Sequence, residues 1–175
     1  MIAESLATLA ARFPNSNSLI AHLVLLLPGS STAPYLSPAF CLGAVLTILG
    51  ASLRFACFRA LGTNFTYELA IRDKHKLITS GPYSIVRHPA YMGTMLVAVG
   101  ATLAELSPGS WWTEANVMDT GFGRVAAVLW VVGLLVRVSL LLRAPKEDAM
   151  LREHFGKEWE EYAQRVRWWY VPGVI

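Results

Sequence analysis

The fold is decided by an apolar stretch, Val125–Leu142, which reads V-A-A-V-L-W-V-V-G-L-L-V-R-V-S-L-L-L. Its one charged residue is Arg137. A helix needs about 20 mostly apolar residues to cross the hydrocarbon core of a bilayer, and this stretch nearly reaches that length. The stretch therefore predicts a membrane-spanning helix.

The composition of the whole chain agrees with a membrane protein. Of its 175 residues, 54% are hydrophobic and 15% are charged, whereas soluble domains usually carry about 25% charged residues. This excludes a disordered chain, which needs low hydrophobicity and high charge. The net charge of +3 is too small to indicate nucleic acid as the main partner. The two cysteines, Cys41 and Cys57, form no disulfide framework and are expected to be buried thiols.

Three further apolar stretches predict the remaining spans. Leu36–Phe58 is long enough and is interrupted only by Arg54. Tyr91–Leu106 is shorter. Leu19–Leu27 must extend back across a polar segment to cross a bilayer, so an interfacial or bent helix is the alternative there. We expect an all-α transmembrane bundle of about four spans.

The distribution of basic residues predicts the orientation of these spans. Arg59–Arg87 holds five basic residues and the tail after Leu142 holds six, whereas Pro28–Tyr35 and Ser107–Gly123 hold none. Because cytosolic loops are enriched in Lys and Arg, the basic segments are predicted to be cytosolic. With four spans, both termini then lie in the cytosol.

The tail after Pro145 has the pattern of an amphipathic helix. Its apolar residues recur at steps of three or four, which places them on one helical face. Pro145 suits the first turn of a new helix. The pattern predicts a cytosolic helix that folds back on the membrane or the bundle. The apolar positions are Leu151, Phe155, Trp159, Tyr162 and Val166.

No metal site is indicated, because the four histidines are dispersed without ligand spacing. A first polar segment is Lys76–Gly93, and within it His88-Pro89 marks the point where a membrane helix is expected to begin. The free N–H groups and positive dipole of that helix start, with Arg87 and His88, are suited to an anionic group. The alternative is that both basic side chains only reach lipid headgroups.

A second polar segment, Arg143–Asp148, begins where the last span ends. Arg143 is suited to two-pronged binding of a carboxylate, and Glu147 to binding a hydroxyl or amine donor. The alternative for the acids is a solvated helix start. Arg137 lies inside the apolar stretch, where both a functional role and a side chain extended to the cytosolic face remain open.

Taken together, these motifs resemble the signature of isoprenylcysteine carboxyl methyltransferases. The first block is Leu77-Ile-Thr-Ser-Gly-Pro-Tyr83, followed by Arg87-His-Pro-Ala-Tyr91 and Gly93. The second block combines Arg143 and Glu147 with Phe155-Gly156, Trp159 and Tyr162. The resemblance covers residues 60–175. It implies one integral-membrane methyltransferase domain over residues 1–175, with membrane helices in 1–59 and the cofactor-binding core in 60–175.

The resemblance implies S-adenosylmethionine as methyl donor. The implied acceptor is the C-terminal carboxylate of a prenylated cysteine, on CaaX-type proteins at the endoplasmic reticulum membrane. Arg143 would be the catalytic residue that faces this carboxylate. The implied cofactor contacts are His75, Lys76, Leu77, Ile78, Tyr83, His88, Pro89, Ala90, Tyr91 and Glu147.

Three alternatives stay open at this point. A phospholipid N-methyltransferase would use the same cofactor but methylate an amine, which must first lose a proton to an acid-base group such as Glu147 or Asp148. A membrane reductase with a similar helical core would bind a nicotinamide cofactor. A non-catalytic relative would bind neither.

Overall fold

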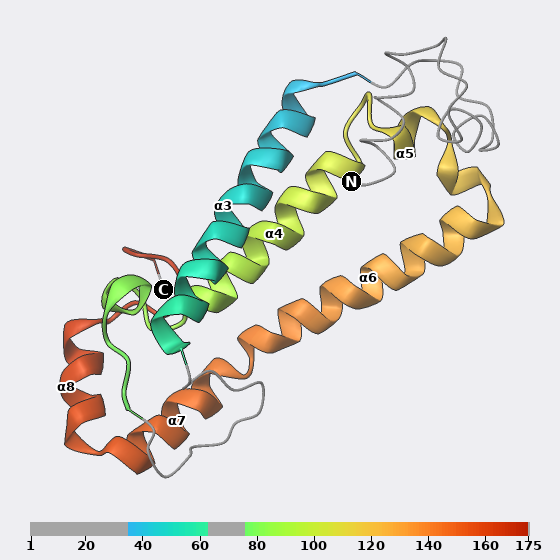
Figure 1. Ribbon diagram of the computed structural model, residues 1–175. Coiled ribbons are helices and arrows are strands. Elements are labelled where there is room, and N and C mark those ends of the chain that lie inside the picture. The colour runs from blue at the N-terminus through green and yellow to red at the C-terminus, as the bar shows by residue number, and fades with distance from the viewer. Residues whose placement is uncertain (1–34, 63–75, 175) are drawn as a thin grey trace. The chain divides into compact units, whose positions relative to one another are not determined.

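The computed structural model describes residues 35–62 and 76–174 (Figure 1). These residues are helical or irregular and contain no strand, which confirms the all-α prediction. The predicted span Leu19–Leu27 and the predicted cofactor contact His75 lie outside them. In chain order the elements are α3 (Pro38–Leu61), η2 (Gly81–Ser84), α4 (Pro89–Glu105), α5 (Trp111–Glu114), η3 (Val117–Asp119), α6 (Gly121–Leu141), α7 (Ala144–Phe155) and α8 (Lys157–Arg165).

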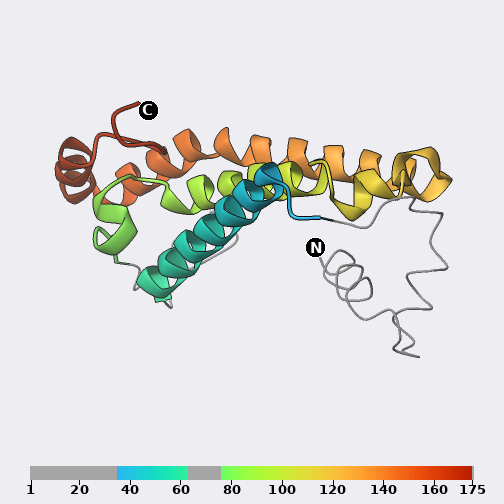
Figure 2. The same ribbon diagram turned by 90° about the horizontal axis from the view of Figure 1, so that it is seen from above.

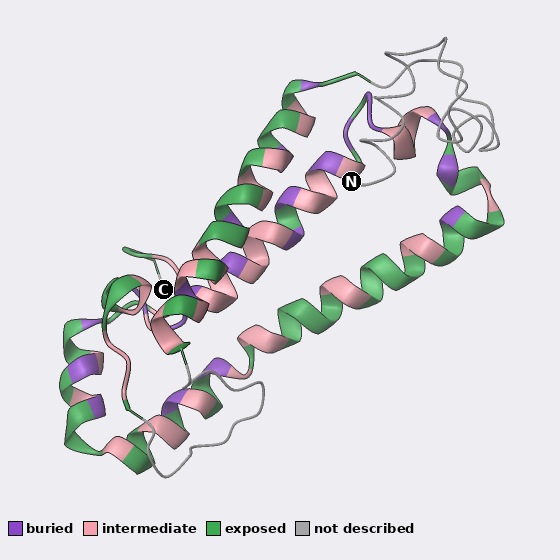
Figure 3. Ribbon diagram, in the orientation of Figure 1, coloured by how far each residue is buried: buried purple, intermediate pink, exposed green. Residues whose placement is uncertain are grey.

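Two of the predicted spans are helices long and apolar enough to cross a membrane. They are α3, with a mean hydropathy of 1.8, and the helical stretch that begins with α6, with 2.5. Most of α6 is exposed (Figure 3), as expected of a helix whose apolar surface faces lipid. The third predicted span is α4, whose 17 residues rise about 26 Å, slightly less than the roughly 30 Å of a hydrocarbon core.

The contacts of the chain divide it into two compact units. The first consists of Met1–Thr47 and Ala98–Leu134, and the second of Ile48–Val97 and Leu135–Ile175. Each of α3, α4 and α6 contributes residues to both units.

In the first unit, α3 and α4 lie side by side (Figures 1 and 2), and glycines bring their backbones into contact. A Cβ atom on Gly43 would lie 2.6 Å from the Gly100 carbonyl oxygen, and one on Gly100 would lie 2.6 Å from that of Gly43. Small residues of this kind let membrane helices approach closely. Cys41, on the same helix, is exposed, so its predicted burial is wrong.

In the second unit, the same two helices pack through Gly50 and Gly93. A Cβ atom on Gly50 would lie 2.7 Å from the Gly93 carbonyl oxygen. Arg54 donates to the Thr94 hydroxyl and the Ala90 carbonyl, both on the first turns of α4. This cation inside an apolar helix is therefore satisfied by the neighbouring helix.

The C-terminal region of the second unit is a pair of helices, not the single amphipathic helix that the spacing predicted. Gly156, with φ 54° and ψ −120°, separates α7 from α8. The predicted apolar face still forms one cluster, because residues of both helices meet. Its buried members are Trp159, Tyr162 and Val166, with Leu77, Leu151, Phe155 and Ala163 packed against them. The start of α7 agrees with the prediction, since Pro145 lies in its first turn.

Candidate functional site

The site lies in the second unit and begins just before α4. Arg87 and His88 donate their backbone N–H groups to the carbonyls of Trp168 and Trp169, at 2.9 and 2.8 Å. The C-terminal segment thus satisfies two backbone donors beside the helix start. Pro89 follows as the first residue of α4, where its missing N–H costs nothing. The backbone of Arg87 and His88 is therefore held by the C-terminal segment, and it leads directly into α4.

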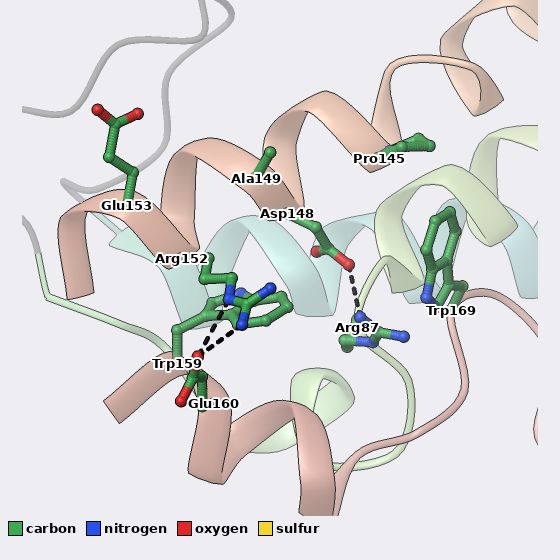
Figure 4. Close-up of a pocket in the computed structure, with 9 residues that line it drawn as sticks. All are labelled: Arg87, Pro145, Asp148, Ala149, Arg152, Glu153, Trp159, Glu160 and Trp169. Carbon is green, nitrogen blue, oxygen red and sulfur yellow. Dashed lines mark hydrogen bonds and ion pairs between the residues drawn. The ribbon is translucent and has the colours of Figure 1, made fainter. Parts of the chain in front are cut away.

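Asp148 of α7 binds the side chains of both Arg87 and His88. One carboxylate oxygen lies 2.6 Å from an Arg87 Nη atom (Figure 4), and the other lies 3.0 Å from His88 Nε2. Asp148 is 6% exposed and His88 is 5% exposed. The hydrogen bond between Arg87 and Asp148 is charge-assisted, and the low exposure of Asp148 shields it from water.

Glu147, the preceding residue, contacts the other side of His88. Its Oε2 accepts a hydrogen bond of 2.7 Å from the Tyr91 hydroxyl and lies 3.9 Å from His88 Nδ1. The rings of His88 and Tyr91 are stacked, with centroids 5.6 Å apart. The Glu147 side chain remains 33% exposed, so it can accept further hydrogen bonds from a ligand.

Aromatic residues enclose this cluster. The Arg87 guanidinium lies over the Trp169 ring at 5.1 Å, a cation–π contact. The Tyr170 hydroxyl donates to the Leu141 carbonyl at the end of α6, and its ring centroid lies 6.0 Å from that of His88. These contacts hold the C-terminal segment against the cluster.

Two further tyrosines connect η2 to α8. The Tyr162 hydroxyl donates a 2.9 Å hydrogen bond to the Tyr83 carbonyl. Burial raises the pKa of the Tyr83 phenol, and the neighbouring Cys57 thiol and Glu147 carboxylate raise it further. Burial also raises the pKa of Tyr162, and the nearby Asp148 carboxylate adds to this. Both phenols therefore keep their protons well above neutral pH and act as donors.

The structure brings together most of the predicted site residues. His88, Tyr91 and Glu147 are in mutual contact, and Tyr83 lies within electrostatic range of Glu147. Arg143 is the residue before α7 and lies within electrostatic range of Tyr91. Pro89 is fully buried, and Ala90 contributes a carbonyl to Arg54, a role that the motif did not predict.

The predicted contacts at residues 76–78 are less closely integrated. Lys76 is exposed, and Ile78 is partly buried. Leu77 packs against the cluster formed by α7 and α8. None of these three side chains makes a described contact with His88 or Glu147.

Sequence reasoning missed the role of Asp148. The sequence indicates Asp148 only as an acid-base group for the alternative methylation of an amine, whereas the structure shows it bound to Arg87 and His88. The available signal was a pair of adjacent cations, Arg87-His88, and a pair of adjacent acids, Glu147-Asp148. Because His88 and Asp148 are 60 residues apart, the sequence alone does not indicate that they pair.

A cavity of about 630 Å³ opens beside this cluster (Figure 4). Apart from Arg87, no residue of the Arg87–Tyr91 motif lines it, and neither does Glu147. Arg152 and Glu160 pair across it at 2.8 Å and join α7 to α8. In the described residues, no group of His, Cys, Asp and Glu is arranged to hold a metal ion. The lining residues are Arg87, Pro145, Asp148, Ala149, Arg152, Glu153, Trp159, Glu160 and Trp169.

Comparison with known families identifies one that matches this chain. Residues 43–115 match the model of the isoprenylcysteine carboxyl methyltransferase (ICMT) family. The matched region includes most of α3, the Arg87–Tyr91 motif and all of α4. It therefore contains the half of the site that precedes the last apolar helix.

Several curated proteins are similar over a longer region. A probable protein-S-isoprenylcysteine O-methyltransferase of Oryza sativa subsp. indica is 34% identical over 126 residues, 71% of this chain and 56% of the rice protein. Protein-S-isoprenylcysteine O-methyltransferase B of Arabidopsis thaliana is 32% identical over 126 residues, with 71% and 55% covered. A Delta(14)-sterol reductase of Ascobolus immersus is 30% identical over 106 residues, with 61% and 21% covered. The chain spans about half the length of the two methyltransferases.

Proposed function

Because the chain belongs to the isoprenylcysteine carboxyl methyltransferase family, we propose that it methylates the C-terminal carboxylate of prenylated cysteine. The proposed methyl donor is S-adenosylmethionine, and the proposed substrates are CaaX-type proteins after prenylation.

The observation that carries this proposal is the contact between the two motifs on which the resemblance rests. Tyr91 and His88 come from the first motif and Glu147 from the second, and the Tyr91 hydroxyl donates to Glu147 at 2.7 Å. Residues that the resemblance assigns to one cofactor site therefore lie together, although 56 residues separate Tyr91 from Glu147.

The chemistry of these residues fits S-adenosylmethionine. The ammonium group and ribose hydroxyls of this cofactor are hydrogen-bond donors, and Glu147 is a partly exposed acceptor. Its sulfonium is a cation, which aromatic faces such as those of Tyr91 and Tyr170 attract. The proposed contacts remain those of the motif: His75, Lys76, Leu77, Ile78, Tyr83, His88, Pro89, Ala90, Tyr91 and Glu147.

The proposed mechanism rests on positioning. When bound, the cofactor supplies a methyl group on a sulfonium, ready for an in-line displacement. A substrate carboxylate is already ionised at neutral pH, so no general base is required. Arg143 would bind that carboxylate with two parallel hydrogen bonds and orient one oxygen for attack. Fixing two reactants in this way contributes about 7–11 kcal/mol toward lowering the barrier.

The proposed membrane arrangement follows from the charges and the helices. We place α3, α4 and α6 across the endoplasmic reticulum membrane, with a further span in the N-terminal region. Both termini, and with them α7 and α8, would lie in the cytosol. The water-soluble cofactor would reach the site from there, and the prenyl chain would enter between helices from the lipid.

The test uses membranes that contain the protein, radiolabelled S-adenosylmethionine and N-acetyl farnesylcysteine. Volatile methanol released by base reports a methyl ester. We expect counts from the unchanged protein and none from Arg143→Ala, whose cofactor binding is retained. Arg124→Ala, an exposed arginine at the other end of α6, is the control and keeps full activity.

Near-normal turnover in Arg143→Ala would reject the proposed role of Arg143. A base-stable product in lipid extracts, without methyl ester, would reject carboxyl methylation and support phospholipid N-methylation. If the unchanged protein does not bind S-adenosylmethionine, both carboxyl methylation and phospholipid N-methylation are rejected.

The similarity to a Delta(14)-sterol reductase supports one alternative. A reductase would bind a nicotinamide cofactor and leave S-adenosylmethionine unbound. Equilibrium binding of the two labelled cofactors to the purified protein separates these functions, and we expect binding of S-adenosylmethionine alone.

A further inference from the structure

Asp148 is the most completely engaged acid in the described part of the second unit. Both of its carboxylate oxygens are used: one on Arg87 at 2.6 Å and the other on His88 Nε2 at 3.0 Å. The two partners are adjacent in the chain, and their backbones are held by Trp168 and Trp169. One buried carboxylate therefore fixes two consecutive side chains at the start of α4.

The contact with Asp148 determines which nitrogen of His88 carries a hydrogen. An ionised carboxylate offers only acceptor sites, so Nε2 must donate to it. The Nδ1 edge of the ring then faces Glu147, whose Oε2 is 3.9 Å away, beyond hydrogen-bond distance. Consecutive acids of α7 thus lie on opposite edges of one imidazole.

We propose that Asp148 is a positioning residue for the methyl-transfer site. It holds His88 with Nε2 protonated and the Arg87 guanidinium fixed, so that the Nδ1 edge of His88 and the Glu147 carboxylate face the ligand together. Asp148 acts through His88 and Arg87 and does not itself touch the reacting atoms. The expected effect on turnover rests on the proposed function, whereas the expected effect on the protonated nitrogen of His88 does not.

The substitution that tests it is Asp148→Asn, which keeps the shape of the side chain and removes its charge. In this variant we expect kcat/KM for S-adenosylmethionine to fall at least tenfold. We also expect the ¹⁵N resonances of His88 to change in protein labelled at histidine and reconstituted in nanodiscs, because Nε2 no longer donates to a carboxylate. His88→Gln identifies the resonance, and Glu161→Gln, an exposed acid of α8, is the control that changes neither quantity.

A second variant covers the case in which Asp148→Asn does not fold because Arg87 has lost its partner. Arg87→Gln with Asp148→Asn leaves no unpaired guanidinium, and we expect low kcat/KM and the same altered His88 resonances. Full activity in this double variant would overturn the proposal, since Asp148 would then only neutralise Arg87. Lost activity with unchanged His88 resonances, in either variant, would also overturn it.

The two measurements separate this inference from the proposed function. If the unchanged protein transfers no methyl group, the proposed function fails. The His88 resonances still decide whether Asp148 determines the protonated nitrogen, since they require no turnover.

Discussion

At the scale of single residues, His88 is the point where the two polar segments meet. Its Nε2 contacts Asp148 at 3.0 Å and its Nδ1 lies 3.9 Å from Glu147. The hydrogen bond between Nε2 and Asp148 holds the imidazole in one orientation, and the Glu147 carboxylate lies beside the opposite edge of the ring. The same acids keep Arg87 and Tyr91 in place. The geometry of the candidate site therefore depends on two neighbouring side chains of α7.

The buried tyrosines lead to a prediction about alkaline pH. Burial raises the pKa of Tyr83 and Tyr162 above the ordinary value of about 10. Between that value and the higher folded-state pKa, the folded protein holds protons that the unfolded chain releases. Their contribution to stability is thus complete below pH about 10 and is lost as the pH rises further.

Absorbance at 295 nm during an alkaline titration tests this prediction. We expect part of the six tyrosines to ionise later in the folded protein than in the denatured chain, and the free energy of unfolding to fall over the same range. Tyr83→Phe should remove one late-ionising phenol. Complete ionisation near pH 10 without unfolding would contradict the burial of these phenols.

At the scale of helices, α3 and α4 are held together by backbone contact. Gly43 meets Gly100, and two helical turns further along α3, Gly50 meets Gly93. In lipid there is little hydrophobic drive between helices, so close van der Waals packing supplies much of their attraction. This makes the four glycines structural requirements.

Gly100→Leu tests this packing. Even the Cβ atom would lie 2.6 Å from the Gly43 carbonyl oxygen, so the helices must separate, and overpacking of this kind costs about 1–3 kcal/mol. We expect a lower thermal transition in detergent. Gly121→Ala, where a Cβ meets no atom within 4 Å, is the control. Equal transition temperatures for the two variants would contradict the packing.

Gly156 supports a second prediction at this scale. Its φ of 54° and ψ of −120° are unfavourable for residues with a side chain, at a cost of about 1–3 kcal/mol. Gly156→Ala should therefore lower the thermal transition although open space surrounds it. The measurement uses the same detergent and the same Gly121→Ala control. An unchanged transition would contradict the strained backbone conformation at Gly156.

At the scale of the whole molecule, the exposed apolar surface and the distribution of basic residues together indicate how the chain lies in a membrane. In the most apolar part of the helical stretch that begins at Gly121, none of the residues is buried. An exposed apolar surface of this size requires lipid or a partner. Basic residues are absent from Ser107–Gly123 and frequent after Leu142. The proposed orientation places these two segments on opposite sides of the membrane.

Labelling of single cysteines tests that orientation. In a background with Cys41→Ala and Cys57→Ser, Glu158→Cys and Asp119→Cys introduce one thiol each at exposed positions. With sealed microsomes, we expect an impermeant maleimide to label Glu158→Cys directly and Asp119→Cys only after permeabilisation. Labelling of both without permeabilisation would contradict the proposed topology.

The sequence by itself determined the helical class, the positions of three apolar helices and the chemistry-bearing motifs. These depend on local properties: the length of an apolar run, the fixed φ of Pro89 and Pro145 at helix starts, and the residue types next to them. The prediction of one helix after Pro145 was wrong, because apolar spacing continues across Gly156 while its backbone conformation does not.

Only the tertiary structure decided which side chains meet. From the sequence, Asp148 is expected to be a solvated acid in the first turns of a helix. Its partners, Arg87 and His88, are about 60 residues away, so only the structure shows the contact. Cys41 and Cys57 lie in the same apolar helix, yet one is exposed and the other is buried. The physical reason is the same in both cases: burial and ion pairing depend on the neighbouring helix, and a residue's own sequence surroundings do not specify that neighbour.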